Sequence, residues 1–477
     1  MSALTTTVLK ALGVFGGVQG LNILAGIVRS KCAALWLGPA GVGVMSLFVQ
    51  SLMTMSYLTQ LSLRQSSVRD LSLLKGEPDG EKARRMSFTA RRLGLWLGIA
   101  GMGLTFLGAP LLSRWTFGNG DYTRAFMILS AVPLMTSLTA PDNAIMQSFG
   151  HLRRLATANV WGSVAGTAAL VCCICFWGMG GIVGAVLAIP AGAWIMARLY
   201  SRGIPGPPAV APTWRESLSE GKGMLMLGAM LTVSDVVTQV ASYVFSIYLS
   251  RRGSVADVGI YQSGFTMVNY YVGVIFTAIS MEYYPRLTAQ VSQRKRTSVL
   301  VSHEISVALW VLMPVAVLFV CFDELMVRLL YSQAFLSMLP FISLAIGGVV
   351  FRAVSWCIAF VMLAKGDGRA YVATEVVSAA VILVLYTSGW ELFRFKGLGT
   401  AYIVWYGVYA AAVYGVFRWR YGMRFGRGIR GLILFAAVVC IGASVLRPLV
   451  GPIATGCLIL PWLIPLSLRR LGLTRGR

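Results

Sequence analysis

Charged and amide side chains that could bind a ligand lie inside long apolar runs of this 477-residue sequence. Gln19, Asn22 and Arg29 recur at a spacing that places them on one face of a helix. A guanidinium in such a setting can bind an anionic group through two parallel hydrogen bonds. Lys31 lies about 200° around the same helix from Arg29. We therefore expect Arg29 to face a binding site and Lys31 to lie nearer its rim.

Three later apolar runs carry similar polar stripes. In chain order, their members are Gln50, Thr54, Tyr57 and Arg64, then Thr232, Asp235, Gln239, Ser242 and Ser246, then Gln262, Thr266, Asn269, Gly273, Thr277 and Ser280. Four polar-faced helices predict one central polar cavity. For the Ser and Thr members, hydrogen bonding between packed helices is an equal alternative.

Two further intramembrane charges, Arg352 and Glu375, belong with these stripes, because an unpaired charge in a bilayer is costly. The candidate site then contains three arginines against two carboxylates, a bias that suits a phosphate or another anionic head group. Asp235 and Glu375 are candidates for ion or proton coupling, because a buried carboxylate can exchange a proton or a sodium ion. A structural ion pair of Arg352 with Glu375 or Asp235 is the alternative.

No catalytic or metal-binding pattern accompanies these residues. His151 and His303 lie beside basic clusters, and no phosphate-binding loop, paired metal-ligand motif or Gly-x-Ser-x-Gly turn occurs. Cys172, Cys173 and Cys175 lie in an apolar run without the spacing of a zinc site. We expect no catalytic residue, no metal, no cofactor and no enzymatic activity.

Composition indicates the elements that position these residues. The chain is 57% hydrophobic and 12% charged, whereas globular proteins carry about 25% charged residues. A soluble enzyme, a disulfide scaffold and a disordered chain are excluded. The net charge of +24 would indicate nucleic acid in a soluble protein, but cytoplasmic loops of membrane proteins are also basic. The sequence predicts an all-α polytopic membrane protein that binds no nucleic acid.

Fourteen apolar runs are long enough to cross a bilayer. They lie near residues 8–34, 41–66, 88–112, 122–143, 152–177, 180–200, 220–249, 257–283, 298–322, 336–364, 370–389, 397–418, 429–446 and 452–468. Basic residues gather in every second connection, which predicts that both termini are cytoplasmic.

A Pro- and Gly-rich stretch after the sixth run divides the chain. We expect an N-terminal lobe of six spans in residues 1–200, a cytoplasmic linker in residues 201–216 and a C-terminal lobe of six spans in residues 217–421. Residues 422–477 add two spans and a basic tail. Two lobes of six spans are the usual plan of secondary transporters.

Three segments resemble Wzx-type O-antigen translocases. They are Lys31 to Phe48 with its run Leu37-Gly38-Pro39-Ala40-Gly41-Val42-Gly43-Val44, Asp257 to Leu287, and Arg352 to Glu375. The resemblance covers most of residues 5–420 in order. It implies the fold of the multidrug/oligosaccharidyl-lipid/polysaccharide (MOP) superfamily, also called MATE-like, with two six-helix bundles around a central cavity lined by spans 1, 2, 7 and 8.

The resemblance also implies a flippase of the bacterial inner membrane that serves lipopolysaccharide biosynthesis. Its substrate would be an undecaprenyl-pyrophosphate-linked oligosaccharide, an O-antigen or related repeat unit, moved to the periplasmic leaflet. Membrane lipids, a polysaccharide polymerase and chain-length machinery are the expected partners. Alternating access of the two lobes would move the substrate. The alternatives are a lipid II flippase, which the two extra spans favour, a multidrug or cation antiporter, and a non-transporting subunit of a polysaccharide assembly complex.

Overall fold

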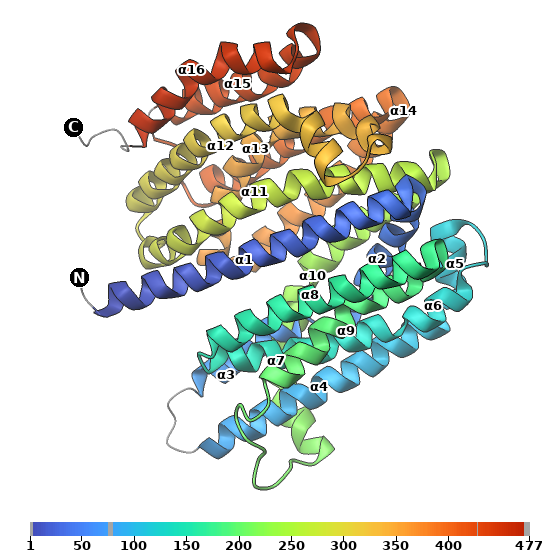
Figure 1. Cartoon of the computed structure of the whole chain (residues 1–477). Coiled ribbons are helices and arrows are strands. Elements are labelled where there is room, and N and C mark those ends of the chain that lie inside the picture. The colour runs from blue at the N-terminus through green and yellow to red at the C-terminus, as the bar shows by residue number, and fades with distance from the viewer. Residues whose placement is uncertain (1–2, 75–79, 427, 472–477) are drawn as a thin grey trace. The chain divides into compact units, whose positions relative to one another are not determined.

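The computed structural model describes residues 3–74, 80–426 and 428–471, and within them all side chains except those of residues 3–19, 230, 231, 271, 274, 278 and 281. The regular elements of this part are helices, with no β-strand among its residues. Contacts divide the chain into two compact units, Met1–Gly259 and Ile260–Arg477. Figure 1 labels the helices. The all-α class predicted from the sequence is confirmed.

The first unit contains the helices up to the start of α11. They are α1 (Ala3–Trp36), α2 (Gly38–Gln60), α3 (Leu63–Leu73), α4 (Gly80–Leu107), α5 (Ala109–Phe117), α6 (Thr123–Leu129), α7 (Ala131–Ser148), α8 (Leu152–Trp177), the 3₁₀ turn η1 (Gly178–Gly181), α9 (Ile182–Tyr200), α10 (Trp214–Arg252) and the first residues of α11 (Val255–Gln290).

The second unit contains the rest of α11 and the later helices. These are α12 (Arg294–Leu330), the 3₁₀ turn η2 (Gln333–Met338), α13 (Leu339–Ala364), α14 (Gly368–Gly415), the π-helical turn η3 (Val416–Arg420), α15 (Ile429–Val450) and α16 (Pro452–Arg470).

Several helix ends follow from local sequence. The Thr213 side chain accepts a hydrogen bond from the Glu216 amide, and the Glu216 carboxylate accepts one from the Thr213 amide, so a capping box begins α10. Asp367 caps α14 by accepting from the Ala370 amide at 3.2 Å. These caps satisfy amide groups that a helix leaves without an internal partner.

Two long helical stretches fold back on themselves. In α14, Phe393 and Arg394 leave helical geometry. The Trp405 indole donates to the Ser378 hydroxyl at 2.9 Å, so residues at similar distances before and after this bend lie side by side. The stretch that contains α8 and α9 folds back at η1 in the same way, and these two helices pack along their length (Figure 1).

The second predicted span is broken near its end. Leu61 and Ser62 both have positive φ, so α2 ends at Gln60 and a separate helix α3 begins at Leu63. A Cβ atom at Gly228 of α10 would overlap the Leu61 carbonyl. The absence of a side chain at this glycine therefore lets α10 approach the break closely.

Eight helical stretches in the described part are long and apolar enough to cross a membrane, or up to eleven if each of three bent pairs counts as one span. Two of the eight, Leu152–Tyr200 and Gly368–Arg420, are the stretches that fold back. The chain is therefore a multi-pass membrane protein, while the number of fourteen spans and their orientation stay predictions.

The two compact units divide the chain within α11. In the first unit α10 packs against α2, α3 and α4. In the second unit α15 and α16 pack against α12, and α15 also packs against α13. The lobe, linker and appendix boundaries expected from the sequence stay predictions.

Candidate functional site

Arg352 of α13 lies in a partly buried setting of aromatic and amide groups. Its Nη1 donates to the Asn269 Oδ1 at 2.5 Å and to the Tyr402 hydroxyl at 3.3 Å. The guanidinium carbon lies 5.7 Å from the centre of the Phe276 ring and 5.6 Å from that of Tyr406. Ring faces attract a cation at these distances. The second unit thus brings together two residues predicted to bind substrate, Arg352 and Asn269.

No carboxylate contacts Arg352 within the described ranges. Glu375 of α14 instead accepts a hydrogen bond from the Tyr409 hydroxyl at 2.5 Å. The alternative of a structural ion pair between Arg352 and Glu375 is therefore not what the structure contains. Nη2 and Nε of Arg352 donate no hydrogen bond to a described residue, so one edge of the guanidinium can still bind an oxyanion at two points.

Asp235 of α10 lies at the break between α2 and α3. The Ser62 hydroxyl is 3.0 Å from the Thr232 hydroxyl and donates to the Asp235 Oδ2 at 3.5 Å. The structure therefore brings the candidate coupling residue Asp235 together with two hydroxyl groups.

The polar stripes on α2 and α10 face each other. Ser246 donates to the Gln50 side-chain oxygen at 3.1 Å, and the Gln239 amide donates to the Gln50 main-chain oxygen at 3.4 Å. These contacts join two helices, which is the alternative weighed for the Ser and Thr residues of the stripes. This part of the stripes connects α2 to α10.

Arg64 does not continue the stripe of α2. The periodicity that grouped it with Gln50 and Tyr57 assumes one unbroken helix, but Arg64 lies on α3, beyond the break. Its guanidinium is exposed and donates to the Gln147 side chain of α7 at 3.5 Å. The two positive-φ residues interrupt the helical repeat, so the sequence argument for a shared face fails here.

The remaining predicted residues have less informative positions. Asn22, Arg29 and Lys31 are partly buried on α1, and Gln262 is partly buried on α11. The side chain of Gln19 lies outside the described residues. Their assignment to substrate binding stays a prediction.

Sequence reasoning missed two buried carboxylates that form ion pairs. Asp142 of α7 is 2.8 Å from Arg91 and 3.6 Å from Arg198. In the second unit Asp323 of α12 forms an ion pair with Arg447 of α15. The sequence does contain a signal for these ion pairs, because a carboxylate inside an apolar run needs a cationic partner. In the described part of the chain, no group of three or more His, Cys, Asp or Glu residues could hold a metal ion.

Comparisons with known proteins agree on one class. A family model described as polysaccharide biosynthesis protein matches residues 81–340. The lipid III flippase of Escherichia coli K12 is 26% identical over 414 residues, which cover 84% of this chain and 96% of that protein, and the lipid III flippase of Shigella flexneri matches equally.

Solved structures show the same fold. The lipid II flippase MurJ in an inward closed conformation superposes with a TM-score of 0.73 at 12% identity, covering 96% of this chain and 99% of that one. An inward-facing multidrug resistance transporter of the MATE family, in the MOP superfamily, gives a TM-score of 0.70 at 16% identity, covering 88% and 98%. The MATE-like fold is thus confirmed. All four proteins are named as flippases or transporters, which agrees with the expectation that this chain is not an enzyme.

Proposed function

This chain belongs to the polysaccharide biosynthesis protein family, and from that premise we propose that it is a flippase for an undecaprenyl-pyrophosphate-linked oligosaccharide. The lipid III flippases, 26% identical along nearly their whole length, support a lipid-linked substrate. An O-antigen or related repeat unit is the oligosaccharide that the residue motifs favour. On this proposal the chain acts in the bacterial inner membrane beside the polymerase and chain-length machinery.

The observation that carries the proposal is the set of contacts around Arg352, which leaves its charge without a counter-ion among the described residues. Its guanidinium is held by an amide oxygen, a phenol and two aromatic rings. None of these groups carries a charge that neutralises it. Two donor nitrogens remain for a ligand, and a pyrophosphate offers oxygens spaced for such a fork. An antiporter of organic cations would need the opposite charge at this position.

Transport would proceed by alternating access, with the sugar chain in a polar path and the prenyl tail in lipid. Asp235 at the α2–α3 break and Glu375 beside Tyr409 are the groups we assign to ion or proton coupling. Each carboxylate has hydroxyl neighbours that could stabilise either its charged or its neutral form.

Complementation of a bacterium that lacks its O-antigen translocase tests this proposal. The wild-type chain should restore surface O-antigen, and Arg352→Gln should not, because glutamine lacks both the charge and the fork. Arg394→Gln is the matched control. Arg394 also lies over an aromatic ring, that of Trp390 at 4.9 Å, but it is exposed at the bend of α14.

Protein amount and thermal stability are measured for each variant. Restoration by Arg352→Gln at wild-type protein level would refute the role of this guanidinium. If the wild-type chain does not restore O-antigen in this host, the same set is tested in a host that lacks its lipid III flippase. Failure of the wild-type chain in both hosts would refute the proposed substrate class.

A further inference from the structure

A second basic site lies in the first unit, whereas Arg352 belongs to the second unit. A pocket of about 660 Å³ opens between α4, α7, α9 and the chain that follows α9. Five arginines and one aspartate are the charged groups of its wall, a formal net charge of +4. The arginines are Arg84, Arg91, Arg92, Arg198 and Arg202. No residue of the candidate substrate site belongs to this wall.

Internal contacts account for only part of this charge. Asp142 pairs with Arg91 at 2.8 Å and lies 3.6 Å from Arg198. Within the described residues, neither Arg84 nor Arg202 forms a side-chain hydrogen bond or ion pair, and both are exposed. The pocket therefore presents at least two guanidinium groups that have no counter-ion in the described part of the chain.

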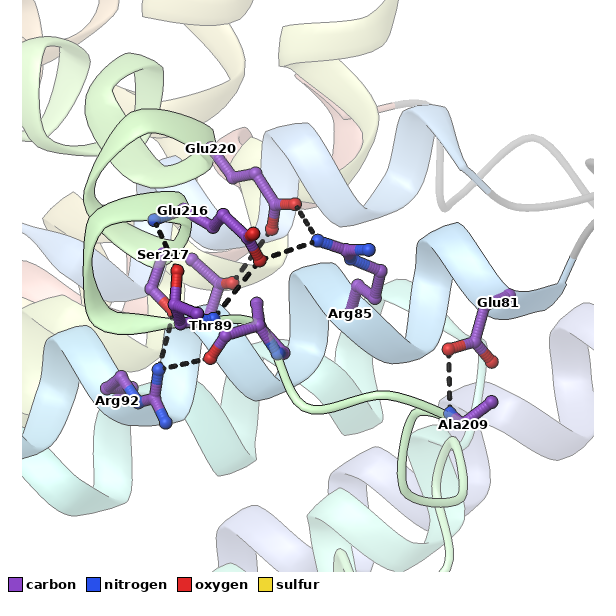
Figure 2. Close-up of polar contacts among 10 residues, drawn as sticks. Glu81, Arg85, Thr89, Arg92, Ala209, Glu216, Ser217 and Glu220 are labelled. Atoms are coloured by element: carbon purple, nitrogen blue, oxygen red, sulfur yellow. Dashed lines mark hydrogen bonds and ion pairs between the residues drawn. The ribbon is translucent and has the colours of Figure 1, made fainter.

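Hydrogen bonds from α4 hold in place the Pro- and Gly-rich chain that forms one wall of the pocket. Arg91 donates to the Ser201 carbonyl at 3.2 Å, and Arg92 donates to the Pro212 carbonyl at 2.5 Å and to the Ser217 hydroxyl at 3.0 Å. Figure 2 shows the Arg92 contacts. The side chain of Ile204, only 4% exposed, belongs to the core formed by α3, α7, α8 and α9. The pocket is thus a preformed feature of the unit.

A second set of contacts fixes the same chain to α4. Glu81 accepts from the Ala209 amide at 2.7 Å, and Arg85 pairs with Glu216 at 3.2 Å and with Glu220 at 3.0 Å, as Figure 2 shows. These contacts tie the start of α10 and the chain before it to α4. Ordering this wall in advance lowers the entropic cost of binding a ligand against it.

The pocket is polar at one end and apolar at the other. On α4, Arg84 and Leu95 are separated by about 16 Å of helix at about 1.5 Å per residue. On α9, Trp194 lies one turn before Arg198, and the chain then leads to Arg202 and the linker. Leu95 follows Arg92 by three residues on α4, Leu138 precedes Asp142 by one turn on α7, and Trp194 precedes Arg198 by one turn on α9, so these apolar side chains lie at the end of the pocket away from the linker. Such a gradient matches a phosphate joined to a hydrocarbon chain.

We propose that this pocket binds the phosphate headgroup of an anionic membrane lipid, with Arg84 and Arg202 on the phosphate and Leu95, Leu138 and Trp194 against the acyl chain. Basic pockets between helices at the cytoplasmic surface recognise anionic lipids in this way. A free phosphate shares the headgroup chemistry but has no use for the apolar end. The site is separate from the proposed transport function and is tested by binding alone.

The test measures binding to the purified full chain in a neutral detergent. The probes are dioctanoyl phosphatidylglycerol, dioctanoyl phosphatidylcholine and glycerol 3-phosphate. Wild type should bind phosphatidylglycerol at least tenfold more tightly than either other probe. The double variant Arg84→Gln/Arg202→Gln should bind it about 30-fold more weakly than wild type. Arg153→Gln/Arg154→Gln, which removes two exposed arginines of α8 outside the pocket, should bind within twofold of wild type.

Each contrary result overturns a defined part of the proposal. Equal binding of the two lipids, or unchanged binding by Arg84→Gln/Arg202→Gln, would exclude recognition of the phosphate charge. Equal binding of glycerol 3-phosphate would make the ligand a free phosphate and exclude the lipid. If the double variant does not fold, the affinity of the wild-type chain for phosphatidylglycerol is compared in 0.05 M and 0.5 M NaCl. Binding through charge should weaken at the higher salt concentration, and an unchanged affinity would overturn the proposal.

Discussion

Asp323→Asn is expected to destabilise the second unit, because it leaves Arg447 as an unpaired cation among apolar helices. Asp323 of α12 is fully buried and accepts hydrogen bonds from Ser343 of α13 and Arg447 of α15. The Arg447 side chain is 15% exposed, and its buried Nε has no hydrogen-bond partner among the described residues. The pair therefore links α15 to two other helices.

The magnitude follows from this burial. Breaking a buried ion pair by removing one partner costs about 3–5 kcal/mol, because the other charge stays buried without compensation. Asparagine can still accept from Ser343, so we expect Asp323→Asn to lower the free energy of unfolding by about 3 kcal/mol. If the contact behaved as a neutral hydrogen bond between helices, the loss would be only about 0.6 kcal/mol.

The assay is reversible unfolding of the purified protein in mixed micelles with increasing sodium dodecyl sulfate. Glu324→Gln is the matched control one residue along the same helix. Glu324 pairs with Arg328 at 2.8 Å, but both side chains are 46% exposed. Exposed pairs of this kind contribute only about 0.3–0.5 kcal/mol. The double variant Asp323→Asn/Arg447→Gln should recover at least about 1 kcal/mol relative to the sum of the single losses, because it removes both charges.

Two results would refute this reasoning. Equal losses for Asp323→Asn and Glu324→Gln would show that burial does not strengthen the pair. Strict additivity in the double variant would show that the two side chains do not interact.

Four other substitutions have expected outcomes. Gly43→Ala should cost about 2 kcal/mol in thermal unfolding, because its Cβ would overlap the Val255 carbonyl at the start of α11. By contrast, no described atom lies within 4 Å of a Cβ atom at Gly273, so Gly273→Ala should stabilise by up to about 1 kcal/mol. Arg352→Lys should not restore surface O-antigen in the complementation host, because an ammonium cannot reproduce the planar fork. Asp367→Asn should increase proteolysis of the α13–α14 connection equally at pH 5 and pH 8. The Arg420 guanidinium holds the pKa of Asp367 at about 2. A depressed carboxyl pKa contributes stability above the unfolded pKa of about 3.8 and loses it only as pH falls towards 2.

The contrary outcomes are equally specific. Equal stability of Gly43→Ala and Gly273→Ala would contradict the close helix approach. Full restoration of surface O-antigen by Arg352→Lys would show that only the positive charge of this residue is needed. If the effect of Asp367→Asn on proteolysis differed between pH 5 and pH 8, the result would contradict the low pKa of Asp367.

Turns encoded by local sequence were predicted well. The run Leu37-Gly38-Pro39-Ala40 does separate two helices, with positive φ at Gly38. The gap between the predicted spans 370–389 and 397–418 contains the bend at Phe393 and Arg394. Such boundaries depend on a few neighbouring residues or on the end of an apolar run, so a single sequence contains their signal.

The break at Leu61 and Ser62 could not be predicted in this way. Neither residue is a glycine or proline, and both lie inside the span predicted near residues 41–66. The break coincides with contacts from a distant helix, namely the approach of Gly228 to Leu61 and the hydroxyl pair of Ser62 and Thr232. Tertiary contacts therefore override local helix propensity here.

The surroundings of Arg352 were also only partly predictable. Helical spacing identified Asn269 as a polar residue on α11, and the structure places it on the guanidinium. Tyr402 and Tyr406 of α14 are one turn apart in a run that reads as apolar. Nothing in their spacing distinguishes rings that contact a cation from rings that fill a core.

The bend at Phe393 and Arg394 has a consequence for biogenesis. Because only these two residues leave helical geometry, we expect the chain before and after the bend to enter the bilayer as one hairpin. The orientation signal of each half then also fixes the other half, and the basic residues near Arg420 act on the topology of the segment that begins at Gly368. Cutting the gene between the two halves would separate segments that the insertion machinery receives as a single unit.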